Sequence, residues 1–342
     1  MLQPELVQLK DDRNLLNRIE YTGSFANSVI TLNTFYEAGS GQEQKREFAY
    51  VKVADGTGIF AWIDYNGDGI PQLNEFETAA FKDQANYIRV FTPTNEYVRT
   101  KFNQLGFVTG LNPAAVSKRK LKSGKIISRF SDQFSLRIEN KNLTDALWKG
   151  LNPFENNIDD TLLISASSSL RNTVFYNRTS TTFGTDLTYD HNSGKTLLTN
   201  GIETRRLERW ILNSRLNFSR SYGLQQKLEA GKKLNRSGFF SERDYNLELF
   251  TSESRFNYQP GSNWRLSFIY EYKLKKNSPQ LTGEFSEQHR GGTEIKFSNV
   301  QKGIITAKFN TIRIIYNGKE NSSLAYEMLE NRKQQSHSYR RR

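Results

Sequence analysis

The chain of 342 residues contains no cysteine and only three histidines. The lack of cysteine excludes disulfide bonds and thiolate metal sites, and it is compatible with a bacterial exported β protein that folds without oxidation. His191, His289 and His337 are isolated in the sequence, which leaves little for a zinc site or a histidine-based triad. A carboxylate-only active site stays open, but no pair of acidic residues stands out, and we expect no enzyme.

Long apolar runs are also missing. No run reaches the roughly eighteen apolar residues of a membrane-spanning helix, so we expect no such helix. The first residues, from Met1 to Glu5, have neither the basic segment nor the apolar segment of a secretory signal. We therefore expect either a cytosolic protein or a piece of a longer exported chain.

Positive charge is in excess, at a formal net charge of +12. The densest internal basic run is at residues 118–125, but no DNA- or RNA-binding motif accompanies it, and most other cations are spread singly along the chain. This distribution favours a solvated face or a contact with anionic lipid, and we expect no nucleic-acid partner.

One stretch, residues 64–75, matches the twelve-residue calcium loop of EF-hands nearly position for position. Calcium prefers about six to eight oxygen ligands, and a glycine at position 6 permits the sharp turn of the loop. Gly69 occupies that position. The candidate calcium ligands, at loop positions 1, 3, 5, 7, 9 and 12, are Asp64, Asn66, Asp68, the carbonyl of Ile70, Gln72 and Glu75.

The alternative is a turn rich in Asn, Asp and Gly without a metal, although such a turn has no need of Glu75. The preceding residues 58–63 are apolar strand formers, which predicts a loop inserted between strands and not a helix-loop-helix unit. We expect a short helix at residues 75–84, a strand at 87–92 and a turn at 92–96.

Strand patterns dominate the chain. In residues 264–274, Trp264, Phe268 and Tyr270 belong to an apolar row that alternates with mostly polar residues. Residues 210–219 repeat the pattern, and in 245–258 the apolar parity changes, which predicts a bulge near residues 251–254. Nearer the N-terminus, a glycine-rich turn at residues 38–41 is expected within a hairpin.

The domain organisation predicted from these patterns has three parts. Residues 1–155 form β hairpins with the calcium-loop insertion, 156–330 form antiparallel barrel-type strands, and 331–342 form a polar, aperiodic tail. Short connections at 221–223, 260–263 and 300–302 alternate with longer ones at 235–243, 276–290 and 317–323. This alternation is typical of outer-membrane barrels, although a soluble antiparallel sandwich also has alternating strands.

An ordered set of motifs resembles the C-terminal part of large, uncharacterised outer-membrane β-barrel proteins of Bacteroidota. The motifs are at residues 39–48, 62–69, 73–77, 87–95, 167–173 and 325–330, and the resemblance covers about residues 14–330. It implies a cell-envelope β protein and no known catalytic residues. Members of that family continue through further strands after the last motif, whereas this chain continues into the polar tail.

The sequence therefore predicts an all-β antiparallel meander that is a segment of an outer-membrane β-barrel, with an EF-hand-like calcium loop between strands. The expected function is structural or related to transport, with calcium as cofactor and outer-membrane lipid and other envelope proteins as partners. The alternative is a soluble calcium-binding module for cell-surface adhesion or glycan binding, which would bury its apolar faces between two sheets.

Overall fold

The structure, a computed structural model, describes residues 15–117, 124–143, 150–154, 162–198, 201–238, 243–299, 303–319 and 322–330. Most of the basic run at 118–125 and the whole tail at 331–342 therefore lie outside the described residues. Among the residues that are described, no helix is both long enough and apolar enough to cross a membrane.

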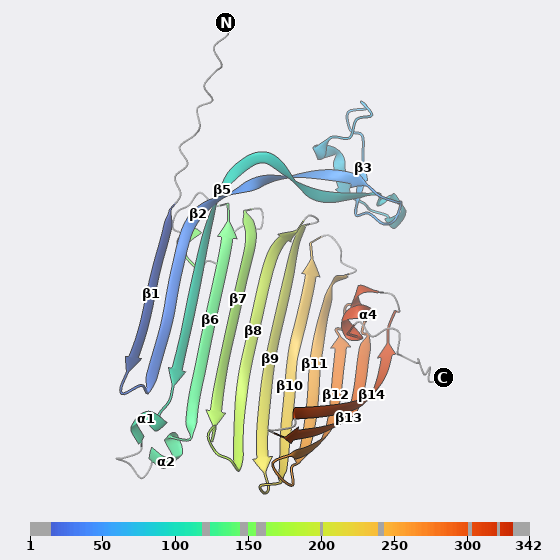
Figure 1. Cartoon of the computed structure of the whole chain (residues 1–342). Coiled ribbons are helices and arrows are strands. Elements are labelled where there is room, and N and C mark those ends of the chain that lie inside the picture. Colours follow the sequence, from blue (N-terminus) through green and yellow to red (C-terminus); the bar gives the residue numbers. More distant parts are fainter. Residues whose placement is uncertain are drawn as a thin grey trace.

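The expected all-β antiparallel meander is confirmed: the strands form one 14-stranded sheet in which the long strands pair in chain order (Figure 1). The long strands are β1 (Leu16–Phe25), β2 (Ile30–Lys52), β5 (Tyr87–Leu111), β6 (Phe130–Asn142), β7 (Leu163–Tyr176), β8 (Phe183–Leu198), β9 (Gly201–Asn217), β10 (Tyr222–Ser237), β11 (Tyr245–Tyr258), β12 (Trp264–Asn277), β13 (Phe285–Asn299) and β14 (Gly303–Asn317). Among the described residues, β1 pairs only with β2 and β14 only with β13, so the sheet is not closed.

The two faces of this sheet differ in polarity, and the apolar face is the exposed one. On β12, Phe268 and Tyr270 are 48% and 51% exposed, whereas Ser267 and Glu271 on the opposite face are 3% and 6% exposed. The strand registers continue the apolar side from β1 to β14. We call it the outer face. It carries, among others, Ile19, Tyr21, Phe25, Ile30, Val174, Leu187, Trp210, Leu212, Tyr222, Leu228, Phe250, Phe256, Trp264, Ile295, Ile305 and Phe309, all of them exposed.

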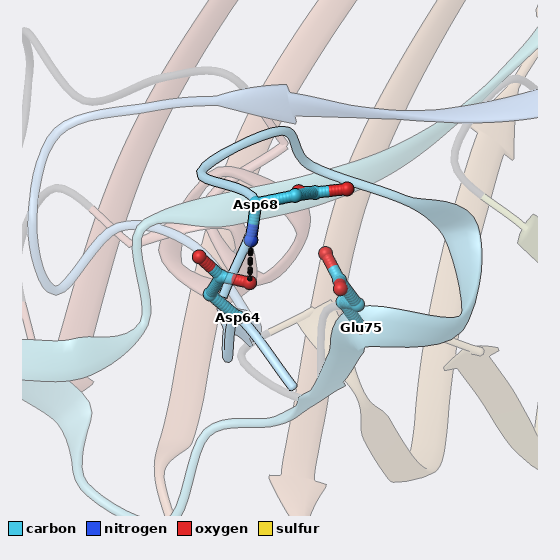
Figure 2. Close-up of side chains that lie close together, drawn as sticks. All are labelled: Asp64, Asp68 and Glu75. Atoms are coloured by element: carbon cyan, nitrogen blue, oxygen red, sulfur yellow. Dashed lines mark hydrogen bonds between the residues drawn. The ribbon is translucent and has the colours of Figure 1, made fainter. Parts of the chain in front are cut away.

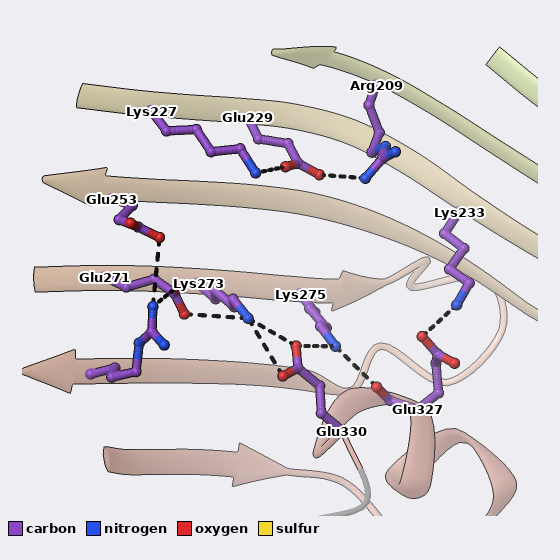
Figure 3. Close-up of polar contacts among 11 residues, drawn as sticks. Arg209, Lys227, Glu229, Lys233, Glu253, Glu271, Lys273, Lys275, Glu327 and Glu330 are labelled. Atoms are coloured by element: carbon purple, nitrogen blue, oxygen red, sulfur yellow. Dashed lines mark hydrogen bonds and ion pairs between the residues drawn. The ribbon is translucent and has the colours of Figure 1, made fainter. Parts of the chain in front are cut away.

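The opposite, inner face is held together by ion pairs between neighbouring strands (Figure 3). Arg209 on β9 contacts Asp190 on β8 at 2.5 Å and Glu229 on β10 at 3.3 Å. Arg290 on β13 lies 2.7 Å from Glu271 on β12. Because these side chains are partly buried, pairing removes the cost of leaving single charges away from water.

A short helix, α4 (Ser323–Met328), lies on the inner face near one end of strands β11 to β14. Leu324 and Met328 of the helix form the described apolar core together with Leu247, and Tyr245, Leu249 and Tyr316 pack against them. The side chain of Ser322 caps the helix by accepting the backbone N–H of Ala325 at 3.0 Å.

Charged contacts also join this helix segment to the sheet. Lys233 lies 2.6 Å from Glu327, and both Lys273 and Lys275 lie 3.2 Å from Glu330.

The bulge expected at 251–254 is wrong, and the packing of α4 on β11 explains the change of parity that suggested it. The register of β11 with β10 and β12 is continuous, and the apolar parity changes because Leu247 and Leu249 face α4 while Phe250 and Phe256 lie on the outer face.

Two turns expected in the N-terminal part are also wrong. Residues 38–41 lie within β2, where Gly39 permits close packing: a Cβ there would lie 2.6 Å from the Leu15 carbonyl oxygen. Residues 92–96 lie within β5. The register shifts between Gln44 and Arg46, so the chain forms a bulge. Pro93 is tolerated because, among the described strands, only β2 pairs with this part of β5.

The predicted connections need several corrections. The short connection expected at 221–223 lies earlier, at 218–221, because β10 begins at Tyr222, and the one expected at 235–243 starts later, because β10 continues to Ser237. The long connection predicted at 276–290 is shorter, because β12 continues to Asn277 and β13 begins at Phe285. The connection predicted at 300–302 lies outside the described residues. The expected boundary near residue 155 falls between β6 and β7, which pair with each other along Phe130 to Asn142. The division into domains therefore stays a prediction.

Candidate metal centre

The predicted calcium loop lies at the far end of a two-stranded ribbon. Among the described residues, β5 pairs with β6 only from Lys101 onward, and its N-terminal part continues with β2 out to Lys52, where Tyr87 also pairs with Phe60 of β3. Figure 1 shows this ribbon leaving the sheet and ending in a small unit that contains β3 (Phe60–Trp62) and β4 (Phe76–Thr78). The loop joins β3 to β4, so the expected insertion between strands is confirmed.

Aromatic packing anchors this unit on the ribbon. Tyr50 of β2 stacks on Phe76 with ring centroids 3.9 Å apart, and it meets Phe60 edge-on at 5.1 Å. This packing also explains why the helix expected at 75–84 is wrong. Phe76 is held extended by pairing of β4 with β3, and only short 3-10 turns form, at Leu73–Glu75 and Lys82–Gln84.

Asp64 organises the first half of the loop. Its Oδ1 accepts the backbone N–H of Gly67 at 2.7 Å, and its Oδ2 accepts that of Gly69 at 2.8 Å. Gly67 and Gly69 have φ of 74° and 69°, a left-handed conformation that glycine adopts without strain. The backbone of the tight turn therefore converges on the Asp64 carboxylate, and a glycine stands at position 6 as in a calcium loop.

Asp68 is the centre of the amide contacts. Its Oδ2 accepts the side-chain N–H groups of Asn66 at 2.9 Å and Gln72 at 2.7 Å, while its Oδ1 accepts the backbone N–H of Ile70 at 2.7 Å. Asn66 and Gln72 thus lie within the site, with their amide nitrogens toward Asp68. The predicted contact of the Ile70 carbonyl with a metal stays a prediction.

Glu75, at the twelfth position of the loop, is only 1% exposed. Trp62 donates its indole N–H to Glu75 Oε2 at 2.9 Å, and the backbone N–H of Gln72 donates to the same oxygen at 3.1 Å. Figure 2 shows Asp64, Asp68 and Glu75 turned toward one another. One carboxylate oxygen from each lies within 4.8 Å of the others.

The donor set fits a hard divalent cation. Among the described residues, no lysine or arginine lies within ion-pair distance of Asp64, Asp68 or Glu75, although Glu75 is buried. A buried carboxylate without a cationic partner is costly, and a cation among the three oxygens would supply that charge. Oxygen-only ligands are those that calcium prefers.

Two aromatic contacts at the loop were not predicted, one from Trp62 just before the loop and one from Tyr65 at its second position. Trp62 contacts the buried carboxylate directly, and Tyr65 donates its phenol to Glu77 at 2.5 Å. The hydrogen bond to the Glu77 carboxylate raises the pKa of the Tyr65 phenol. The only signal for Trp62 in the sequence is its place two residues before the loop, where a β3 side chain can point back toward position 12.

Comparison with known proteins adds no relative: no protein-family model, no curated protein and no solved structure matches this chain.

Proposed function

We propose that this chain is a segment of an outer-membrane β-barrel with a structural or transport-related role, and that calcium stabilises the loop at residues 64–75. One observation carries the proposal: the exposed face of the sheet is apolar and the inner face is polar and ion-paired. A water-soluble sheet places its apolar face in a core. The inverse arrangement is typical of strands whose outer face meets lipid.

Strand length and aromatic placement support the same proposal. A membrane-spanning strand needs about 9 to 11 residues, and the long strands here have 10 to 25. Aromatic side chains occupy outer-face positions near the strand ends, including Tyr222 and Trp264, where barrel strands carry their aromatic girdles. The resemblance of the motifs at 39–48 and 325–330 to Bacteroidota outer-membrane proteins agrees with this assignment.

Tryptophan fluorescence in vesicles tests the membrane assignment. In variants that keep one tryptophan each, lipids brominated on the acyl chains should quench Trp210, which is 52% exposed on the outer face. They should leave Trp62 unquenched, because its indole is held against Glu75 in the projecting unit. Equal quenching of the two residues, or none of Trp210, would refute the assignment.

Calcium titration tests the loop. Trp62 touches Glu75, so its fluorescence should change as calcium binds, with a dissociation constant in the range of about 1 µM to 1 mM. Glu75→Gln should weaken binding sharply. The control Glu77→Gln alters an exposed carboxylate two positions away that contacts Tyr65 and should bind normally. No response at about 10 mM calcium, above the weakest range expected, would mean that the loop is only a turn.

A further inference from the structure

A cavity of about 660 Å³ lies on the inner face, where β9 to β12 approach their short connections. It is far along the chain from the calcium loop. Its lining contains four arginines, Arg215, Arg220, Arg255 and Arg265, and one carboxylate, Glu294. The lining therefore has three more positive than negative charges, four minus one.

The hollow exists because one cross-strand row of the inner face has short side chains. The register places Gly223 of β10 between Asn217 of β9 and Asn257 of β11, and Asn257 in turn pairs with Ser267 of β12. A Cβ at Gly223 would lie 2.6 Å from Asn217 Oδ1. Elsewhere the inner face is filled by long ion-paired side chains such as Arg209 and Glu229.

The next row places two guanidinium groups beside this hollow. Arg215 on β9 and Arg255 on β11 flank Gln225 on β10 in the same register row. Neighbouring strands are about 4.8 Å apart, so the two arginine backbones are about 10 Å apart. Such a spacing lets both side chains reach one small anionic group from opposite sides.

These arginines lack the close carboxylate partners found further along the same face. Arg209 and Arg290 pair with carboxylates at 2.5 and 2.7 Å. Arg255 reaches Glu294 and Glu253 only at 3.8 and 4.0 Å. Among the described residues, Arg215 and Arg265 have neutral partners, the Ser180 carbonyl at 2.6 Å and Gln259 Oε1 at 3.0 Å.

We propose that this cavity binds a phosphate or sulfate ester of a sugar-sized molecule. Arginine presents a planar set of donors that matches the oxygens of such groups. The volume lies in the range of about 300–1,000 Å³ of pockets for small organic ligands, so a bare ion would leave most of it to water. Neutral donors and acceptors such as Thr181, Asn257 and Gln259 line the rest and suit hydroxyl groups. The inference goes beyond the proposed membrane role, because the inner face carries the cavity whatever covers the outer face.

Calorimetry on the full chain, in whichever buffer or detergent keeps it folded and monodisperse, tests the proposal. Glucose 6-phosphate and glucose 6-sulfate should bind, glucose should not, and inorganic phosphate should bind at least about tenfold more weakly than the esters. Arg215→Gln and Arg255→Gln should each weaken ester binding by about tenfold or more. Arg205→Gln is the control, because it removes the same charge from the inner face of β9 beside Glu203, away from the cavity.

Unchanged secondary structure by circular dichroism would show that the variants fold. Equal binding of glucose and its esters, or equal loss of affinity in the Arg205 control, would overturn the site. Equal affinity for inorganic phosphate and the esters would overturn the assignment of a sugar-sized ligand.

Discussion

Arginine in place of Phe268 tests which solvent meets the outer face. Phe268 is 48% exposed on β12 and follows Trp264, at the start of the strand, by four residues. At about 3.3 Å per residue and a tilt of about 40°, it lies about 10 Å deeper than Trp264. The apolar band of a barrel is about 25 Å tall, so Phe268 would lie near its middle.

The informative quantity is the difference between Phe268→Arg and Phe268→Ala, because both variants lose the same aromatic ring. In lipid, arginine should cost about 2–4 kcal/mol more at this depth, which is a factor of about 30 to 700 in the folding equilibrium. In water, the two exposed side chains should differ by no more than about 0.5 kcal/mol. The two environments therefore give separable results.

The measurement is the urea midpoint of the full chain in phospholipid vesicles, followed by tryptophan fluorescence and by protection from trypsin. Thr251→Arg, on the inner face beside Glu229 and Lys273, is the matched control and should be tolerated. Ser267 is unsuitable as a control because it is only 3% exposed and donates to Asn257. Equal midpoints for the arginine and alanine variants of Phe268 would refute the lipid-facing assignment.

Three further outcomes are expected. Met328→Ala should weaken the docking of α4 by about 2–5 kcal/mol, because Met328 is 2% exposed. Limited proteolysis should then cut residues 323–330 of this variant, but not of the control Tyr326→Ala, which changes an exposed position. Burial raises the pKa of Glu330, but the nearby Lys275 and Lys273 outweigh this effect, so the pKa lies below the ordinary 4.5. This lowered pKa stabilises docking above about pH 4.5. The protection of α4 against hydrogen exchange, taken relative to the intrinsic exchange rate at each pH, should therefore fall as the pH drops through the lowered value, and Glu330→Gln should remove this pH dependence. Gly39→Ala should cost about 1–3 kcal/mol of stability and so lower the thermal midpoint. Gly41→Ala should leave the midpoint unchanged, because a Cβ at Gly41 would lie 3.7 Å from its nearest neighbour, Thr100 Oγ1.

The sequence predicted the strands well because alternation with a period of two is a local signal. The row containing Trp264, Phe268 and Tyr270 does share one face, as expected. Alternation shows that two faces differ, but it does not say whether the apolar face meets a core or another medium. That information came from burial, which places Ser267 and Glu271 away from solvent and leaves the aromatic row exposed.

The signal for the loop is equally local, because all its residues lie within one short stretch, and its pattern located Asp64, Asp68 and Glu75 within one cluster. The inner face was not predictable in this way. The pair Lys233 and Glu327 is 94 residues apart in the sequence, and no periodic signal links the two positions. The change of parity in β11 was misread for the same reason, since the segment that covers Leu247 belongs to α4, far along the chain.

The open edges of the sheet set a requirement on the proposed role. Phe309 on β14 and Ile19 on β1 are among the most exposed apolar residues, at 72% and 67%, and among the described strands these two edges have one partner each. Water can satisfy the free N–H and C=O groups of an edge strand, but hydrocarbon cannot, at a cost of several kcal/mol per group. An outer face that meets lipid therefore requires β1 and β14 to pair with each other or with strands of an envelope partner, and the proposal for the outer face is inseparable from the closure of these edges.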